Sequence, residues 1–324
     1  MRGRGDFHPS LCPARAWQLV KNWATGSYIC KTEQRNLTVE LIEIGQRKEG
    51  YGGFIGSYLI RGRLNFLVDV GPAASVDSLL DSILERGVRK LDYVLLTHIH
   101  LDHAGGLGAI AQAYPEARVI AHAGALLHLS NPDALWHGSL KVLGGVALYY
   151  GEPSPVDEKI LISHNDAYIE GLDIIETPGH APHHLSFSYD GYLFAGEACG
   201  NYFPEESDYM RPATPPPFFL DAYLSSMDKL LSLPDMKMCF AHLAMMPGSH
   251  AFLGRARDQI VLWRDSVLNL LSRFPELTVE ECMEELLCLD CNLAGFKGMK
   301  RPARDRERFF MGNSIKGLIG FLKR

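Results

Sequence analysis

Several features that would assign the chain to a special class are missing from its 324 residues. No stretch approaches the roughly 18 consecutive apolar residues of a membrane-spanning helix, so we expect no membrane partner. The net charge is −6, which leaves no basic excess of the kind a nucleic-acid-binding protein shows, and no nucleic acid partner is expected. The basic start at residues 1–4 is not followed by a continuous apolar segment, so we do not expect a secretory signal.

Cysteine is also scarce. The chain has seven cysteines, an odd number that fits reduced thiols in a cytoplasm better than a disulfide framework. Cys288 and Cys291 form a CxxC motif that could bind a metal or act in redox chemistry. No second CxxC accompanies it, so a structural role is the better interpretation. We therefore predict a cytoplasmic protein.

What the chain does contain is an alternation of strand-like and helix-like patterns. Between residue 37 and about residue 250, short apolar runs alternate with amphipathic segments, which predicts a layered α/β body. Residues 1–36 show weak periodicity and are predicted to be an irregular N-terminal lead-in. After residue 250 the strand patterns stop, and residues 251–324 are predicted to be a helical C-terminal region.

Two segments resist assignment. Residues 123–129 begin like a helix and give way to a loop rich in glycine, proline and aromatic residues. Residues 201–217 are rich in proline and aromatic residues and look too broken for regular structure. Their aromatic side chains are candidates either for the walls of a substrate pocket or for packing in the core.

The densest group of potential metal ligands lies in residues 97–106, Thr-His-Ile-His-Leu-Asp-His-Ala-Gly-Gly. Side chains two positions apart face the same way in an extended segment, so His98 and His100 can hold one ion. Asp102 and His103 are adjacent and must point elsewhere. Four ligands this crowded cannot easily close a tetrahedron around one ion. The pattern therefore suggests a two-metal site that needs further ligands from later in the chain.

Three later strand-like runs each end at a further candidate, namely His180, Glu197 and His242. Ligand pockets in α/β sheets gather at strand ends, so these three residues could complete the site. Gly179 and Gly196 precede two of them and allow close approach of the backbone.

With these motifs in view, residues 38–250 resemble the metallo-β-lactamase superfamily, which includes glyoxalase II-type thioesterases, lactonases and β-lactamases. The matching motifs are Asp69 in Val-Asp-Val-Gly, the cluster His98–His103, Thr177-Pro-Gly-His180, Gly196-Glu197 and His242. The resemblance implies a four-layer αββα sandwich, to which the C-terminal helices would be a small appendage.

The resemblance also implies two divalent metal ions, for which zinc is the first choice and iron or manganese are alternatives. Asp69 would orient a ligand loop or histidine, although aspartate is also a common turn residue. The implied ligand sets are His98, His100 and His180 for the first ion, Asp102, His103 and His242 for the second, and Glu197 as a bridge.

Two departures from the family pattern stand out. The bridging residue is usually aspartate, whereas position 197 is glutamate. The last histidine usually lies in a Gly-His-Gly-like turn, whereas His242 is flanked by Ala241 and Leu243. Among the other histidines, one of His183 and His184 could contact the substrate, although a supporting or surface role is the better interpretation. We expect ordinary loop or core roles for His122, His128, His137, His164 and His250.

On this basis we expect a dinuclear metal-dependent hydrolase with a small-molecule substrate. A metal lowers the pKa of bound water toward roughly 7, so a metal-bound hydroxide would attack an ester, thioester or lactone, with Asp102 as the proton acceptor. The alternatives are a metal-dependent phosphodiesterase or ribonuclease, an iron-dependent persulfide dioxygenase-like oxidoreductase, and a non-catalytic metal-containing sensor. A homodimer is left open.

Overall fold

The computed structural model describes residues 18–21, 28–31 and 37–324. The chain divides into two compact units, Met1–Leu37 and Thr38–Arg324. In the first unit, β1 (Gln18–Lys21) and β2 (Tyr28–Lys31) pair in antiparallel register. Residues 1–36 were predicted to be an irregular lead-in, but residues 18–21 and 28–31 form a regular strand pair. The rest of that segment lies outside the described residues.

The first sheet of the second unit has six strands in the order β3-β4-β5-β6-β7-β8. The first three are antiparallel neighbours, whereas β5 to β8 run parallel. Parallel strands covered on both faces need apolar residues throughout, and Val94 and Leu95 are accordingly buried. The strands are β3 (Thr38–Glu43), β4 (Gly56–Arg61), β5 (Asn65–Val68), β6 (Tyr93–Leu95), β7 (Arg118–Ala121) and β8 (Leu161–Ser163).

The second sheet has five strands in the order β15-β14-β11-β10-β9. Only β11 and β14 are parallel neighbours, and the other pairs are antiparallel. The strands are β9 (Leu172–Glu176), β10 (Leu185–Tyr189), β11 (Tyr192–Gly196), β14 (Lys237–Phe240) and β15 (Ala244–Met246).

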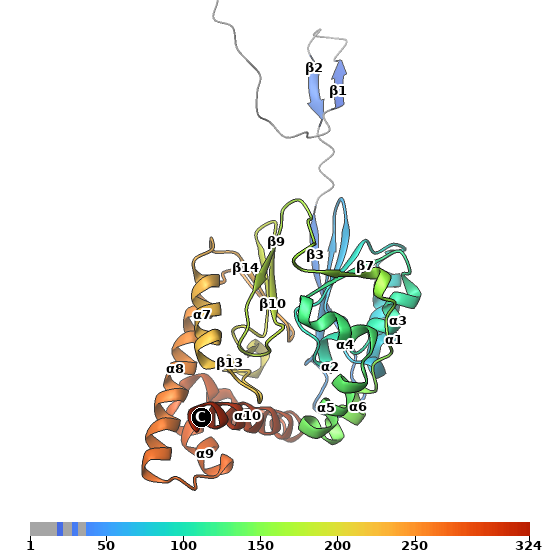
Figure 1. Ribbon diagram of the computed structural model, residues 1–324. Helices are drawn as coiled ribbons and strands as arrows, with labels where there is room; N and C mark the ends of the chain where they lie inside the picture. Colours follow the sequence, from blue (N-terminus) through green and yellow to red (C-terminus); the bar gives the residue numbers. More distant parts are fainter. Residues whose placement is uncertain (1–17, 22–27, 32–36) are drawn as a thin grey trace, which may run out of the picture. The chain divides into compact units, whose positions relative to one another are not determined.

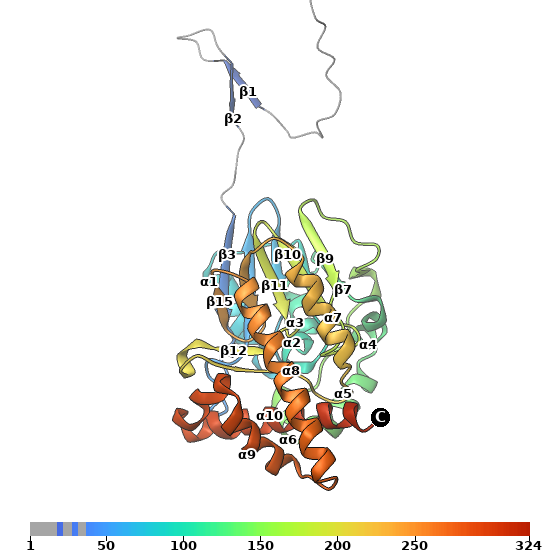
Figure 2. The same ribbon diagram turned by 90° about the vertical axis from the view of Figure 1, so that its left-hand side faces the viewer.

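The two sheets face each other, with helices on both outer faces (Figures 1 and 2). The helices beside the first sheet are α1 (Val76–Glu85), α2 (Leu101–Ala104), α3 (Leu107–Ala113) and α4 (Leu126–Ser130). The second sheet is covered by α7 (Leu220–Leu231) and α8 (His250–Arg273). The predicted αββα sandwich is confirmed.

Aromatic residues join the two sheets. The Tyr58 hydroxyl from β4 lies 2.7 Å from the carbonyl oxygens of Phe240 and Ala244, at the far edge of the second sheet. The Tyr58 ring also packs edge-on against Phe194, with ring centroids 5.3 Å apart. Because Phe240 lies two residues before His242, this contact fixes the loop that carries the last candidate ligand.

Two segments contain regular structure that the sequence patterns do not predict. The expected loop after residue 129 forms α5 (Asp133–Leu143) and α6 (Gly145–Tyr150). The segment 201–217 contains the antiparallel pair β12 (Asn201–Phe203) and β13 (Tyr209–Arg211). Short 3-10 turns occur at Ala73–Ser75, Ala123–Ala125, Glu158–Ile160, Pro204–Glu206 and Cys291–Gly298.

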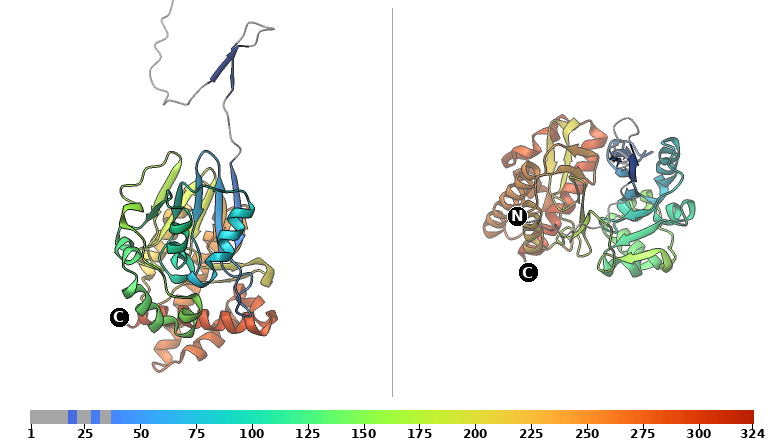
Figure 3. Two further views of the ribbon diagram at one scale, coloured as in Figure 1. Left: turned by 90° about the vertical axis from the view of Figure 1, so that its right-hand side faces the viewer. Right: turned by 90° about the horizontal axis from the view of Figure 1, so that it is seen from above.

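The chain ends in α9 (Val279–Leu289) and α10 (Arg301–Leu322). The start of α9 has a capping box, in which Thr278 and Glu281 each accept a hydrogen bond from the other's backbone N–H. Figures 1 and 3 show α10 running along one end of the sandwich to the green helices α5 and α6. None of the helices in the described ranges is long and apolar enough to span a membrane. The division of the chain that sets residues 251–324 apart as a helical C-terminal region stays a prediction.

Replacing Tyr58 with Phe tests the bond between the sheets. The change leaves a buried carbonyl oxygen without its donor, so we expect the free energy of unfolding to fall by about 1–3 kcal/mol. Urea denaturation measures this, with Tyr168→Phe as the control because Tyr168 is 88% exposed. Equal midpoints for the two variants would show that the hydroxyl contributes nothing to the packing of the sheets.

Candidate metal centre

The structure brings all seven predicted ligands together at loops that leave the two sheets. From the first sheet, His98 and His100 follow β6, and the short helix α2 carries Asp102 and His103. From the second sheet come His180, after β9, Glu197, after β11, and His242, after β14. The site therefore lies where the ends of the two sheets meet.

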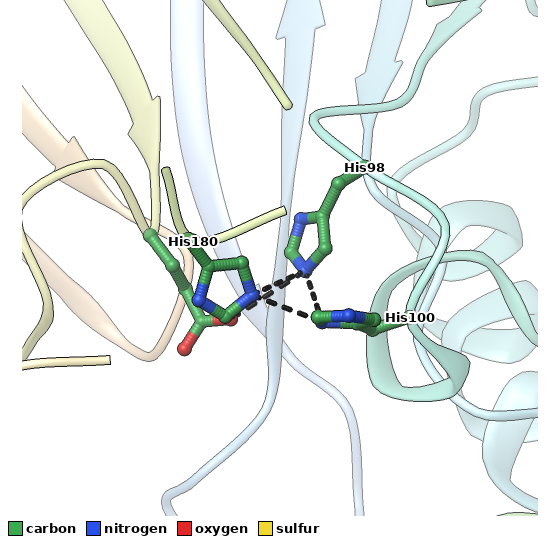
Figure 4. A group of neighbouring side chains, drawn as sticks. His98, His100 and His180 are labelled. Carbon is green, nitrogen blue, oxygen red and sulfur yellow. Dashed lines mark hydrogen bonds and ion pairs between the residues drawn. The ribbon is translucent and has the colours of Figure 1, made fainter. Parts of the chain in front are cut away.

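The first group consists of His98, His100, His180 and Glu197, and Figure 4 shows the three imidazoles pointing toward one another. Nε2 of His98 lies 3.0 Å from Nδ1 of His100 and 3.2 Å from Nε2 of His180. Nε2 of His180 lies 2.9 Å from Nδ1 of His100 and 2.9 Å from Oε2 of Glu197. A neutral imidazole has one N–H, so these contacts cannot all be hydrogen bonds. Their lone pairs converge on one point, as binding of a cation requires.

The second group consists of Asp102, His103 and His242. Oδ2 of Asp102 lies 3.8 Å from Nε2 of His103 and 3.9 Å from Nε2 of His242. Nε2 of His103 is buried and has no hydrogen-bond partner among the described residues. Buried polar atoms nearly always have a partner, so this one points to a bound species that completes the group.

The Glu197 carboxylate lies between the two groups. Its Oε2 is 3.5 Å from Nε2 of His98 in the first group and 3.6 Å from Nε2 of His103 in the second. Its Oε1 is 3.5 Å from Nε2 of His242. The glutamate side chain, although longer than aspartate, is thus placed to contact both groups.

The outer nitrogens of the ligand histidines are held by fixed oxygen atoms. Nδ1 of His180 donates to the carbonyl of Ala213, and Nδ1 of His242 donates to the carbonyl of Phe54, both at 2.8 Å. A proton on Nδ1 leaves the lone pair on Nε2, which faces the centre of the group. This is the tautomer that a histidine needs to bind a metal through Nε2.

Asp69 fixes the outer nitrogen of one histidine in each group, directly for His103 and through Thr97 for His98. Its carboxylate accepts hydrogen bonds from Nδ1 of His103 at 3.0 Å and from the backbone N–H and hydroxyl of Thr97 at 2.8 Å each. Because the Thr97 hydroxyl donates to Asp69, it can accept from Nδ1 of His98, 3.1 Å away. The expected orienting role of Asp69 is confirmed, and it is more than a turn residue.

The protonation states suit a cation. Burial, and then the neighbouring imidazoles, hold the pKa values of His98 and His100 well below their usual range, so both rings are neutral at pH 7. Burial alone would raise the pKa of Glu197, but His180 and the other imidazoles outweigh it and keep this pKa well below its usual range. His98 and His100 therefore present neutral imidazoles and Glu197 an ionised carboxylate, which are the forms that bind metals.

The carboxylates around His103 favour a positive charge at this position. Burial would lower its pKa, but the carboxylates of Asp102, Asp69 and Glu197 outweigh burial and raise the pKa well above its usual value. A cation beside these carboxylates would be stabilised by the same negative charges. Converging lone pairs, the orphaned Nε2 atom and fixed outer nitrogens together fit the binding of divalent metal ions by these residues.

A third group, His122, His164 and Glu176, has close ligand atoms but the wrong tautomers. Nδ1 of His164 accepts from the backbone N–H of Ala123, and Nδ1 of His122 accepts from that of Gly124, both at 3.0 Å. The proton of each neutral ring is thus on Nε2, where His164 donates to Glu176 at 2.7 Å. These histidines hold strand ends together, in agreement with the ordinary roles expected for them.

The backbone around Glu197 depends on a close approach by His184. Nε2 of His184 accepts a 3.0 Å hydrogen bond from the Glu197 N–H, and its Nδ1 donates to the Thr177 hydroxyl at 2.8 Å. Gly196 has φ +57°, and a Cβ atom there would lie 2.4 Å from Nε2 of His184. At Gly179, φ is +139° and a Cβ would lie 2.5 Å from the Tyr223 backbone. Both glycines are required, as the sequence indicated.

A cavity of about 440 Å³ opens beside the ligands and is lined by residues of α5, α10 and the loop Pro215–Pro217. Asn201 lies in its wall and donates from Nδ2 to Oε1 of Glu197 at 2.9 Å. Residues 201–217, a candidate pocket wall in the sequence, thus contribute Asn201 to the cavity, and α10 reaches it through tertiary packing. His183 also lines the cavity, and burial lowers its pKa to about 4.

The cysteines near the motifs do not take part. Cys199 is buried, and burial raises its pKa well above the usual range, so the thiol is inert. Cys288 and Cys291 are both free, and neither belongs to a ligand group within the described ranges.

Comparison with known sequences agrees with this geometry. The sequence profile of the Metallo-beta-lactamase superfamily matches residues 50–242. A metallo-beta-lactamase fold-containing protein of Sulfurisphaera tokodaii is 33% identical over 189 residues, which cover 56% of this chain and 69% of that protein. A hydroxyacylglutathione hydrolase of Photorhabdus laumondii is 28% identical over 224 residues, which cover 66% of this chain and 72% of the enzyme.

Solved structures show the same fold. An archaeal metallo-beta-lactamase superfamily protein from Sulfolobus tokodaii superposes with a TM-score of 0.64 and 24% identity, covering 86% of this chain and 98% of that one. A metallo-beta-lactamase family protein from Thermus thermophilus gives a TM-score of 0.61 at 20% identity, covering 88% and 93%.

Replacing Gly196 with Ala tests the close approach of His184. The methyl group would displace the imidazole that holds the Glu197 backbone, so we expect a loss of more than 2 kcal/mol in the free energy of unfolding and weaker metal binding. The control is Gly191→Ala, because Gly191 also has positive φ (+80°) but has no atom within 4 Å of an added Cβ. Thermal unfolding and metal analysis measure both, and equal effects would refute the role of His184.

Proposed function

Because this chain belongs to the metallo-β-lactamase superfamily, we propose that it is a dinuclear metal-dependent hydrolase of small esters, thioesters or lactones. The observation that carries the proposal is the pair of ligand groups joined by Glu197, each with its histidine lone pairs directed inward. A cavity at the same place gives a small substrate access to both groups.

The ligand assignment follows the two groups. His98, His100 and His180 would hold the first ion and Asp102, His103 and His242 the second, with Glu197 between them. Zinc is the first choice for mixed imidazole and carboxylate ligands, and iron and manganese are alternatives. When bound, the ions would act as Lewis acids on the substrate and would lower the pKa of water.

The protein's own residues supply position and proton transfer. In hydrolysis, a water oxygen bonds to the carbonyl carbon, the bond to the alcohol or thiol breaks, and the water gives up its proton. Asp102 lines the cavity, and its side chain is 13% exposed, so its carboxylate can accept that proton and pass it to the leaving group. Asp69 keeps the neighbouring His103 in one orientation throughout.

The relatives support hydrolysis as the reaction class. One carries the name hydroxyacylglutathione hydrolase and another, from Methanocaldococcus jannaschii, the name probable metallo-hydrolase, at 28% and 29% identity. These identities support the type of chemistry, and the substrate has to be inferred from the cavity of this chain.

Metal content tests the proposal. We expect close to two divalent ions per chain, and we expect His180→Ala to lose metal and at least 1,000-fold in kcat/KM because the first group loses a ligand (about 10³ by analogy with other essential groups). Elemental analysis of the purified chain measures the metal. His137→Ala is the control, since His137 is exposed and, within the described residues, its ring is hydrogen-bonded to the Asp133 carbonyl alone. One iron per chain with oxygen-dependent turnover would contradict the proposal.

Replacing Asp102 with Asn tests the proton acceptor. The amide cannot take up a proton but keeps an oxygen on the second group, so we expect kcat to fall by about 10²–10⁴ while KM changes little. Steady-state kinetics with a panel of thioesters, lactones, β-lactams and phosphodiesters gives both constants. A kcat within tenfold of the unaltered protein would remove Asp102 from the proposed role.

A further inference from the structure

The cavity beside the ligand groups has one polar part and one apolar part. The polar part contains the ligands themselves and Asn201, whose polar atoms lie within hydrogen-bond or ion-pair distance of one another. The rest of the wall is mainly apolar and is built from α5, the loop Pro215–Pro217 and Phe310 of α10. Its polar members are Ser139, Asn313, Ser314 and the imidazoles of His128 and His183. A substrate with its reacting group at the ligands would therefore extend its remaining atoms along apolar side chains.

Among the described residues, the wall also offers no lysine and no free arginine. None of the described residues lining the cavity is a lysine, and the arginine among them is Arg211. The Arg211 side chain is 3% exposed, and its Nε donates to Oε2 of Glu307 at 2.6 Å. Glu307 also accepts from Arg306, which does not line the cavity. An anionic group on the substrate would therefore lose its hydration without gaining a lysine or a free arginine as a partner.

The helix α5 is suited to cover an apolar chain. None of its residues is fully buried, yet Leu135, Val142 and Leu143 face the cavity, and Val142 is 46% exposed. Apolar side chains left open on a short helix gain stability when an apolar ligand covers them. Phe310 and the prolines contribute the other side of the same space.

We infer that the substrate is an electrically neutral ester, thioester or lactone whose apolar chain lies between α5 and α10. The inference rests on the proposed function for the reacting group and on the cavity for the rest of the molecule. A thioester whose thiol carries carboxylates is a poor substrate, because its charges face the apolar wall.

A chain-length series tests the apolar part. For neutral esters with linear acyl chains of increasing length, kcat/KM is expected to rise about two- to fourfold per methylene, from the transfer free energy of a buried CH₂, until the cavity is full. Gly138 lies in the wall, and an added Cβ there meets no atom within 4 Å. Gly138→Leu should shorten the optimal chain and lower kcat/KM for the longest ester at least tenfold.

The matched control is Gly254→Leu, in α8, where an added Cβ also meets no atom within 4 Å and which does not line the cavity. Leucine favours helix over glycine at both positions, so both variants should fold. The control should keep the chain-length profile of the unaltered protein. A flat profile, or the same profile in both variants, would overturn the inference.

Charge preference is tested with two thioesters of one acyl group, one with a neutral thiol and one with a thiol that carries carboxylates. We expect kcat/KM to favour the neutral thioester at least tenfold. Val142→Lys places a cation at the wall and should narrow that ratio, whereas Leu148→Lys, 67% exposed on α6 and outside the wall, should not. A preference for the anionic thioester in the unaltered protein would overturn the inference.

Binding separates failure of this inference from failure of the proposed function. Calorimetry with 1-octanol needs no turnover, and Gly138→Leu should weaken its binding at least tenfold relative to Gly254→Leu. Octanol binding without hydrolysis of any ester would retain the apolar site and reject the proposed hydrolase. Hydrolysis without octanol binding, and without a chain-length preference, would retain the hydrolase and reject the apolar substrate.

Discussion

The hydrogen bonds of the Asp69 carboxylate are the interaction on which the centre depends. Asp69 follows β5 and takes a left-handed conformation with φ +57°. From there it accepts from Thr97 and from His103 and, through the Thr97 hydroxyl, orients His98. One buried carboxylate thus fixes a histidine in each ligand group, and loss of its charge or position would disturb both.

The same network links the two sheets. The Thr97 carbonyl accepts from the Leu185 N–H of β10 at 2.7 Å, so the loop after β6 is tied to the sheet that supplies the other ligands. On that side, His184 fixes the backbone of Glu197, and the carbonyl of Ala213 fixes His180. The site is therefore assembled from loops whose positions are set by hydrogen bonds across the sandwich, and its geometry does not depend on any single strand.

The ligands could be predicted from the sequence because each follows an apolar run that ends abruptly. Strand ends meet at one end of a sandwich, so residues as far apart as His98 and His242 were expected together and were found together. The helix α5 could not be predicted in the same way. Pro132 and the pair Gly144-Gly145 flank it closely and Gly138 lies inside it, so the segment has the composition of a loop.

Polar contacts between residues far apart in the chain could also not be predicted from the sequence. Arg211 and Glu307 are 96 residues apart, and their ion pair keeps Arg211, the arginine among the described residues of the cavity wall, from contact with a substrate. The sequence showed that histidines were plentiful but not which nitrogen of each would be free. That difference separates the centre from the third group at His122 and His164. There a backbone N–H donates to Nδ1 of each ring, so Nδ1 cannot carry the proton that leaves Nε2 free for a metal.

The most direct test of the account is an anomalous-scattering crystal structure of the full chain loaded with zinc. The account predicts two zinc peaks, one among His98, His100 and His180 and one among Asp102, His103 and His242, with the Glu197 carboxylate beside both. A single peak, or zinc at His122, His164 and Glu176 in place of either predicted position, would contradict it.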